Sequence, residues 1–145
     1  MFMDHVAIMR KSWGLTEKIL TGEKKIESRW YQTKRTPWDR INPGETIYFK
    51  DSGEPVSIRA KVSKVLQFDD LTPKKVKSIL GRYGLADGIE KWQKMRFFKR
   101  FKDKRYCILI FLKNAKQIRP LEVNKKGFGT MTAWLAIPNI NIIKK

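Results

Sequence analysis

The sequence is poor in the residues that build disulfides, zinc sites and hydrolytic triads. Among its 145 residues it has one cysteine, Cys107, and one histidine, His5. These counts exclude a disulfide framework, a Cys/His zinc site and any triad that needs a separate cysteine and several histidines. Long hydrophobic runs are missing too, because the longest apolar run, residues 107–112, is far too short to span a bilayer. We expect no metal and no cofactor.

Acidic residues are also scarce. Lys and Arg number 32 against 14 Asp and Glu, which gives a formal net charge of +18. A surplus this large favours a polyanionic partner, either nucleic acid or an acidic membrane face. The N-terminus lacks the basic region and long apolar segment of a signal peptide. Because the near absence of cysteine fits a reducing compartment, we predict a cytoplasmic location.

The order of expected elements favours an α+β fold in a single domain, residues 1–145. We find no repeat, no low-complexity stretch and no linker long enough to separate two domains. The hydrophobic patterns predict strands at residues 5–9, 25–31, 46–50, 56–62, 106–112 and 130–137. They predict helices after the first strand and at about residues 73–83 and 87–101. The spacing does not repeat as βαβ units, so a small mixed β-barrel or strongly bent sheet is favoured over a doubly wound sheet.

Capping residues predict where two of these helices begin. Ser12 is expected to cap the first helix, and Gly22 stands where the glycine that ends a helix belongs. Asp87 and Glu90 have the spacing of a capping box, so Asp87 is expected to start the third helix.

The sharpest local signal lies at residues 22–29, Gly-Glu-Lys-Lys-Ile-Glu-Ser-Arg. Glu27 and Arg29 are two residues apart on a predicted strand, so they share one face, roughly 6.6–7 Å apart. Lys24, in the turn before the strand, can reach the same space. Two cations and one carboxylate thus converge where a helix gives way to a strand. The spacing alone leaves open whether they form a site or an ordinary surface pair of Glu27 and Arg29.

The spacing Gly22-x-Lys24-x-x-Glu27-x-Arg29 resembles the GxKxxExR signature of the ASCH family, a branch of the PUA-like superfamily. Residues 43–49, Pro-Gly-Glu-Thr-Ile-Tyr-Phe, resemble the family's Gly-Asp-x-Ile-x-Phe segment. The resemblance is specific over residues 12–65 and only topological beyond them. It implies a PUA-like small mixed β-barrel with a helix after the first strand, two inserted helices, and a cleft lined by the signature residues.

The resemblance implies RNA, or a modified nucleoside, as the partner. In an RNA-binding domain, Lys24 and Arg29 would hold a phosphate or carbonyl oxygen, and Glu27 would accept from a base amino group or orient Arg29. The alternative is a hydrolase with Lys24 and Glu27 as catalytic residues, either an amidohydrolase on an acylated nucleoside or a ribonuclease. In the family's amidohydrolase branch a threonine stands at the position of Glu27, so that arrangement is absent here. No protein partner can be inferred.

A second signal is the basic segment of residues 91–105, which holds eight cations in fifteen residues, with Asp103 as its only acid. We predict that Lys99 and Arg100 contact phosphates. The interleaved aromatic residues, Trp92 among them, are expected mainly in the core. Because cations and aromatic residues interleave instead of lying on opposite faces, a membrane surface is the weaker partner.

Three further stretches offer contacts to a nucleotide. At residues 125–129, Lys126 suits a phosphate and Phe128 could stack on a base, although the glycines there could equally shape a plain turn. Ser12 and Trp13 are placed to reach the cleft, but capping alone would explain Ser12. The aromatic and basic residues 30–40 are expected either to form a rim for a base or to fold back onto the barrel.

Overall fold

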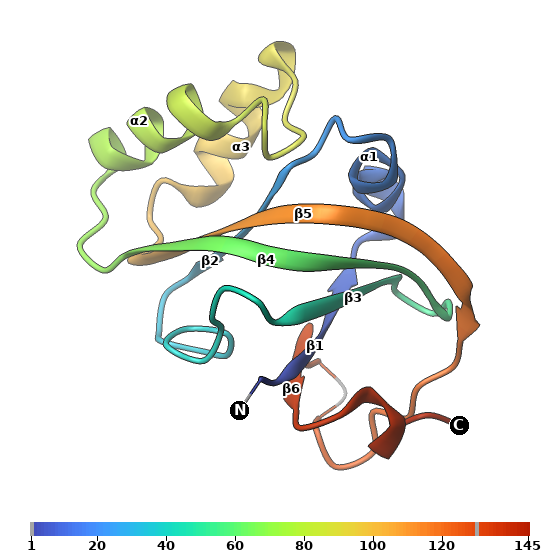
Figure 1. The fold of residues 1–145 in the computed structure, drawn as a ribbon. Coiled ribbons are helices and arrows are strands. Elements are labelled where there is room, and N and C mark those ends of the chain that lie inside the picture. Colours follow the sequence, from blue (N-terminus) through green and yellow to red (C-terminus); the bar gives the residue numbers. More distant parts are fainter. Residues whose placement is uncertain (1, 130) are drawn as a thin grey trace.

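The computed structural model describes residues 2–129 and 131–145, and Figure 1 shows how their elements are arranged. The strands are β1 (Asp4–Met9), β2 (Ile26–Tyr31), β3 (Thr46–Asp51), β4 (Val56–Phe68), β5 (Tyr106–Leu121) and β6 (Trp134–Ile137). The helices are α1 (Leu15–Thr21), α2 (Pro73–Tyr83) and α3 (Lys94–Phe101), with the short 3₁₀ helices η1 (Lys11–Trp13), η2 (Lys91–Gln93) and η3 (Ile140–Ile142). The predicted α+β class is confirmed.

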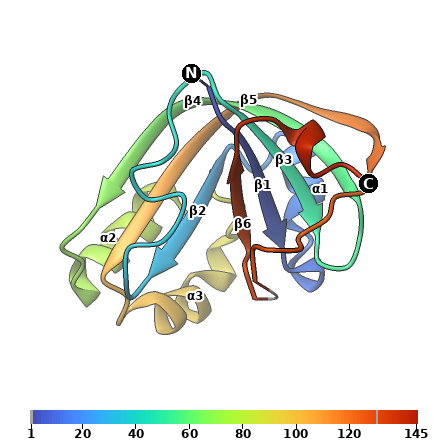
Figure 2. The ribbon, with the colours of Figure 1, turned by 90° about the horizontal axis from the view of Figure 1, so that it is seen from below.

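The described strands form one mixed and strongly curled sheet in the order β2-β5-β4-β3-β1-β6. β1 runs parallel to β3, and the other neighbouring pairs are antiparallel. The register shifts once between β3 and β4 and three times between β4 and β5. Such irregularities bend a strand and increase its twist. The sheet therefore curls into a half-barrel with β2 and β6 as its two edges (Figures 1 and 2).

The strand β5 is apolar at successive positions because both of its faces are covered. Cys107 and Leu109 pack into a cluster with residues of α2 and α3, whereas Ile108 and Ile110 pack inside the half-barrel. Strands buried on two faces show continuous apolar runs instead of alternation. This confirms the prediction of a central strand, which extends further than expected, to Leu121.

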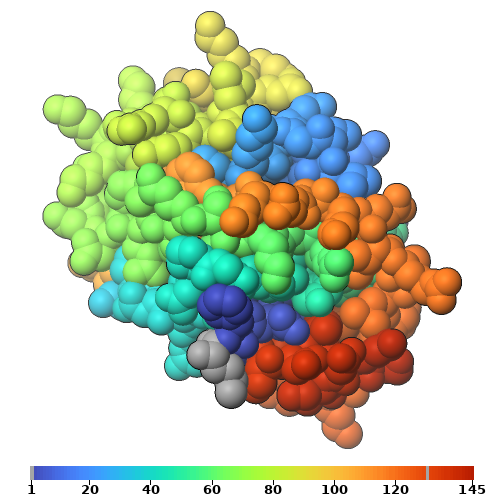
Figure 3. Space-filling view, in the orientation of Figure 1, coloured from blue at the N-terminus to red at the C-terminus, as the bar shows by residue number. Residues whose placement is uncertain are grey.

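The N-terminal strand and the C-terminal segment pack against each other. Val6 of β1, Leu135 and Ile137 of β6, and Ile140 of η3 belong to one buried cluster. In Figure 3 the C-terminal segment (red) packs directly against the N-terminal strand (blue).

Two predicted helix starts were wrong. α1 begins at Leu15 and follows Gly14, whose φ of 64° lies in the left-handed region that glycine adopts freely, so Ser12 sits in η1 and caps nothing. Asp87 does not start a helix either. The capping box is formed by Glu90 with Gln93 at the start of η2, while Asp87 is buried.

The last strand is shorter than predicted, because it pairs with only four residues of β1, from Asp4 to Ala7. β6 begins at Trp134, and Met131, which lies within the predicted range of this strand, is 92% exposed. Thr130, the predicted first residue of that strand, lies outside the described residues. The expectation that Trp92 belongs to the core was also wrong, since it is 72% exposed.

None of the helices in the described residues is long and apolar enough to cross a membrane.

Candidate functional site

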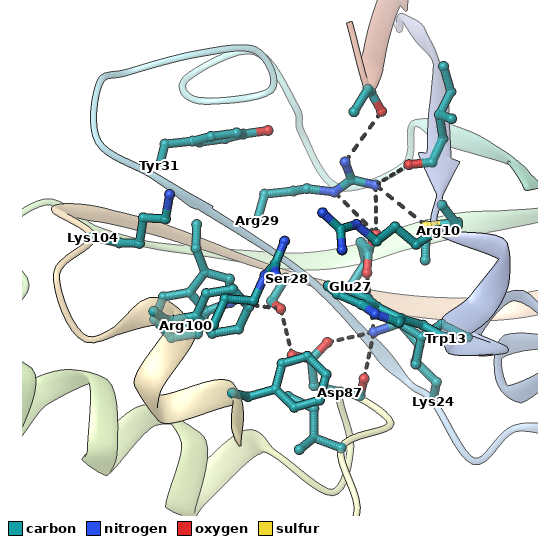
Figure 4. A pocket seen from close by; sticks show the side chains of 18 residues that line it. Arg10, Trp13, Lys24, Glu27, Ser28, Arg29, Tyr31, Asp87, Arg100 and Lys104 are labelled. Atoms are coloured by element: carbon teal, nitrogen blue, oxygen red, sulfur yellow. Dashed lines mark hydrogen bonds and ion pairs between the residues drawn. The ribbon is translucent and has the colours of Figure 1, made fainter. Parts of the chain in front are cut away.

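A cavity of about 270 Å³ lies between β2, the end of β1, η1 and α3 (Figure 4). Charged side chains form its floor, aromatic rings form much of its wall, and cations stand at its rim. The floor residues are Lys24, Glu27, Asp87 and Arg29; the aromatic residues are Trp13, Trp30, Tyr31, Phe97 and Phe101; the rim cations are Arg10, Arg100 and Lys104.

The strand β2 brings the signature residues to this cavity. Ile26 and Trp30 face the cluster under α2 and α3, where the Trp30 ring stacks on Phe101 with 4.6 Å between centroids. Because side chains alternate along a strand, Glu27 and Arg29 face the opposite way and bind each other. Arg29 Nη2 donates to Glu27 Oε2 at 2.9 Å and Arg29 Nε donates to the same oxygen at 3.2 Å. The predicted alternation is confirmed.

Lys24 is the centre of the floor and is only 2% exposed. Its ammonium group donates to Asp87 Oδ1 at 2.5 Å and to the backbone oxygen of Asp87 at 2.6 Å. The third partner is Glu27, with 3.1 Å between Nζ and Oε1. A lysine ammonium has three N–H donors, and here all three have partners. Lys24 therefore holds the floor together and has no donor left for a ligand.

Asp87 is tied into the floor by a second oxygen. Ser28 Oγ donates to Asp87 Oδ2 at 2.5 Å, and Trp30 Nε1 donates to Ser28 Oγ at 3.0 Å. The buried side of the cavity is thus one continuous hydrogen-bonded chain from Trp30 to Lys24. Such networks make a buried site rigid when every member has a partner.

The pKa values of the floor follow from burial and mutual charge. Burial alone lowers the pKa of Lys24, but the carboxylates of Asp87 and Glu27 outweigh it, so this pKa lies above its ordinary value. Burial alone raises the pKa of Glu27, but Lys24 and Arg29 hold it below its ordinary value. Burial, with the charge of Glu27, raises the pKa of Asp87 against the pull of Lys24.

Arg29 connects β2 to the other edge of the half-barrel. Its Nη1 donates to the backbone oxygen of Ala133, and its Nη2 donates to that of Ile8, each at 3.3 Å. Its guanidinium lies 5.0 Å from the centre of the Trp134 ring. A guanidinium has five N–H donors, and in these contacts one Nη1 donor remains. Arg29 therefore cannot bind a ligand phosphate through two donors, and a single hydrogen bond to a carbonyl oxygen is what this arrangement allows.

The Trp134 ring is fixed in turn by a buried histidine. Trp134 Nε1 donates to His5 Nδ1 at 3.0 Å, and His5 Nε2 lies 2.9 Å from Glu45 Oε1. Since Nδ1 accepts, the imidazole carries its proton on Nε2 and is neutral. Burial lowers the pKa of His5, and the hydrogen bond to Glu45 opposes this only in part.

We expect the free energy of unfolding to fall as the pH drops below 6.5. The unfolded chain takes up a proton on histidine near its ordinary pKa of 6.5, whereas folded His5 resists protonation to lower pH. The unfolded state then binds more protons, so acid favours it. Urea unfolding between pH 7.5 and 5 measures the effect, and His5→Gln, which does not titrate, should flatten it. An equal pH slope in both proteins would contradict this assignment.

The rim carries positive charge without local neutralisation. In the described part of the chain, Arg10, Arg100 and Lys104 have no carboxylate within ion-pair distance. Arg10 and Arg100 lie 5.0 and 5.1 Å from the centre of the Trp13 ring. Burial lowers the pKa of Arg100, and the charges of Arg10 and Arg96 lower it further. Cations that crowd together without acids are a ready site for an anion.

The structure brings five of the nine predicted site residues to the cavity. Those that line it are Lys24, Glu27, Arg29, Trp13 and Arg100, whereas Ser12, Lys99, Lys126 and Phe128 do not. The four residues outside the cavity are exposed, and their contact with a nucleotide stays a prediction. Both expectations for residues 30–40 hold in part, because Tyr31 lines the cavity and Trp38 folds back against Tyr106.

Asp87 and Arg10 are the site residues that sequence reasoning missed. Asp87 comes 63 residues after Lys24, and its capping-box spacing pointed to another role. Arg10 directly follows the first strand and belongs to no motif. In the described residues no group of three or more His, Cys, Asp or Glu side chains could hold a metal ion.

No protein-family model and no curated protein sequence matches the chain. Solved structures do. A tyrosine-to-phenylalanine variant of the ASCH protein from Zymomonas mobilis is similar at a TM-score of 0.68 and 17% identity, over 96% of this chain and 93% of that one. The fold is that of an ASCH domain.

The ASCH protein of Zymomonas mobilis without that substitution is similar at a TM-score of 0.65 and 18% identity, over 91% of this chain and 85% of its own. The predicted ASCH fold is thus confirmed. At such identities the likeness establishes the ASCH fold, and the activity has to be argued from the cavity itself.

Proposed function

We propose that this ASCH domain binds RNA and holds one nucleotide in the cavity, with the base inside and the phosphates at the rim. The observation that carries the proposal is the combination of aromatic walls with rim cations that have no acidic partner. Aromatic rings stack on unpaired bases, and arginine and lysine side chains contact phosphates.

The aromatic walls support a planar ligand. Trp13 and Tyr31 line the cavity and are only partly buried, so ring surface remains available to a ligand. Phe97 and Phe101 complete the apolar wall from α3. The volume of about 270 Å³ is at the lower end of small-molecule sites. It suits a single base and its sugar better than a larger ligand.

The floor favours a neutral ligand group. Lys24 and Arg29 balance Glu27 and Asp87 in formal charge, so the floor neither attracts nor repels a base as a whole. The remaining Nη1 donor of Arg29 would bind a base carbonyl oxygen. Lys24 and Glu27 would act by holding Arg29 in place.

The salt dependence of RNA binding tests this function. We expect affinity for a labelled single-stranded RNA to fall steeply with salt, because each neutralised phosphate releases counterions. Arg100→Ala should weaken binding to all sequences alike and reduce the slope of log K against log salt by about 0.7–1. Filter binding over a salt series measures both quantities.

A matched control is Lys116→Ala, an exposed cation on β5 that lines none of the cavities described here. It should change the slope less than Arg100→Ala does. A flat salt response of the wild-type protein, or no binding at low salt, would contradict RNA binding. If Arg100→Ala and Lys116→Ala reduce the affinity and the salt slope equally, the placement of phosphate at the rim is contradicted.

A hydrolase that uses the same cavity is the second candidate. One observation favours it: the Asp87 carboxylate, whose pKa is raised, lies 2.5 Å from Lys24 Nζ and could take its proton. Against it, the pKa of Lys24 is raised, which keeps the amine protonated. The test is whether the protein releases the acyl group from an acylated cytidine or cleaves RNA. If it does, and if Lys24→Met abolishes that activity, the hydrolase replaces the binding-only proposal.

A further inference from the structure

We propose that a second cavity, which Trp13 lines together with the first, binds the base of the neighbouring nucleotide. The proposal rests on the proposed function of the first cavity. The second cavity has a volume of about 260 Å³, close to that of the first. The two cavities share Arg10, Trp13, Leu15 and Phe97 as lining residues.

The lining of the second cavity fits a base beside a phosphate. Arg96 and Lys18 supply positive charge, and the cavity's lining among the described residues includes no acidic side chain. Lys18 donates to the backbone oxygen of Gly88 and lies 3.6 Å from a carboxylate oxygen of Glu90, so Arg96 is the freer cation. Gln93 uses its oxygen to accept from the Glu90 backbone at 3.0 Å. This hydrogen bond does not use the side-chain N–H groups of Gln93, which can therefore donate to a base edge.

Trp13 is held firmly enough to act as a wedge between two bases. The edge of its ring meets Phe97 with 5.4 Å between centroids. Arg10 and Arg100 lie within 5.1 Å of its centre. Aromatic and apolar side chains inserted between bases hold them apart in this way.

The spacing of a single strand agrees with two bases on either side of one indole. Stacked neighbours are about 3.4 Å apart, so an inserted ring of similar thickness requires about 7 Å, which an unstacked strand can span. The phosphate that joins the two nucleotides would then lie near Trp13. Arg10, which lines both cavities, is the residue placed to contact it.

The experiment compares compounds of equal charge. The probes are the 5′-phosphorylated dinucleotide pApA and two analogues, each lacking one of its two bases. Calorimetry on the wild-type protein should show that removal of either base weakens binding about tenfold, since a stacked base contributes about 1–3 kcal/mol. In Ser12→Tyr, a large side chain enters the second cavity alone, because Ser12 lines only that cavity. In this variant, removal of one base should no longer weaken binding, whereas removal of the other should still weaken it about tenfold.

A control and a second variant accompany the test. Lys116→Ala, at an exposed cation that lines neither cavity, should behave as the wild type. Arg96→Ala should weaken the contribution of the same base that Ser12→Tyr removes. If only one base matters in the wild-type protein, or if neither Ser12→Tyr nor Arg96→Ala alters the second base, the second cavity is not a base site, while the first stands. If none of the compounds binds, the proposed function fails together with this inference.

Discussion

Replacing Lys24 by methionine is expected to lower the free energy of unfolding by about 3–5 kcal/mol. The side chains of Lys24, Glu27 and Asp87 are 1%, 4% and 5% exposed, so the substitution leaves buried carboxylates without their central cation. Removing one partner of a buried pair is costly because the charge that remains has neither water nor a counter-ion. Urea unfolding followed by circular dichroism at pH 7 measures the change.

Two comparisons separate this effect from a general loss of packing. The double variant Lys24→Met, Asp87→Asn removes one carboxylate charge as well and should recover a large part of the lost stability, since Glu27 keeps Arg29 as its partner. Lys11→Met, at an exposed pair with Glu54, should leave the unfolding midpoint nearly unchanged. If the single and the double variant lose the same free energy of unfolding, the buried carboxylates left without Lys24 are not the cause of the loss.

Trp13→Ala is expected to weaken RNA binding by about 10–100-fold, the largest loss among single rim substitutions. The indole lines both cavities and lies beside both Arg10 and Arg100. Loss of a stacking platform costs about 1–3 kcal/mol for each base. Filter binding at fixed salt measures the loss, and Trp13→Phe should restore most of it because a ring remains.

Trp92→Ala is the matched control. Trp92 is 72% exposed and lines neither cavity. If RNA binds through general positive charge and any exposed aromatic residue, the two alanine variants will lose similar affinity. That result would contradict the proposed role of Trp13.

The sequence could predict the parts of the site that depend on local geometry. Glu27 and Arg29 were placed on one face because side chains alternate with a period of two along any strand. Gly22 was placed at the end of α1, and its φ of 87° is the left-handed conformation expected there. These relations involve neighbours in the chain, so periodicity and turn chemistry are enough.

The rest of the site depends on contacts that no local pattern encodes. Asp87 reaches Lys24 across 63 residues, in a turn that the packing of α2 against β2 and β5 brings to the cavity. Its capping-box spacing was a real local signal, but Glu90 and Gln93 satisfied the need for a cap instead. Ser12 lost its predicted role because Gly14 offered a turn between η1 and α1.

The bridge from Arg29 to Ala133 and Ile8 has a consequence for how the protein meets other chains. An edge strand presents unpaired backbone groups to which a strand from another molecule can add. Here β2 and β6 are the two edges, and the Arg29 guanidinium on β2 donates to the backbone oxygen of Ala133, directly before β6, and to that of Ile8 in β1. The half-barrel is thus fastened by a side chain where a closed barrel would use a backbone ladder. The residue that shapes the cavity therefore also links the two open edges, and we expect its loss to leave both edges more accessible to strand addition from another molecule.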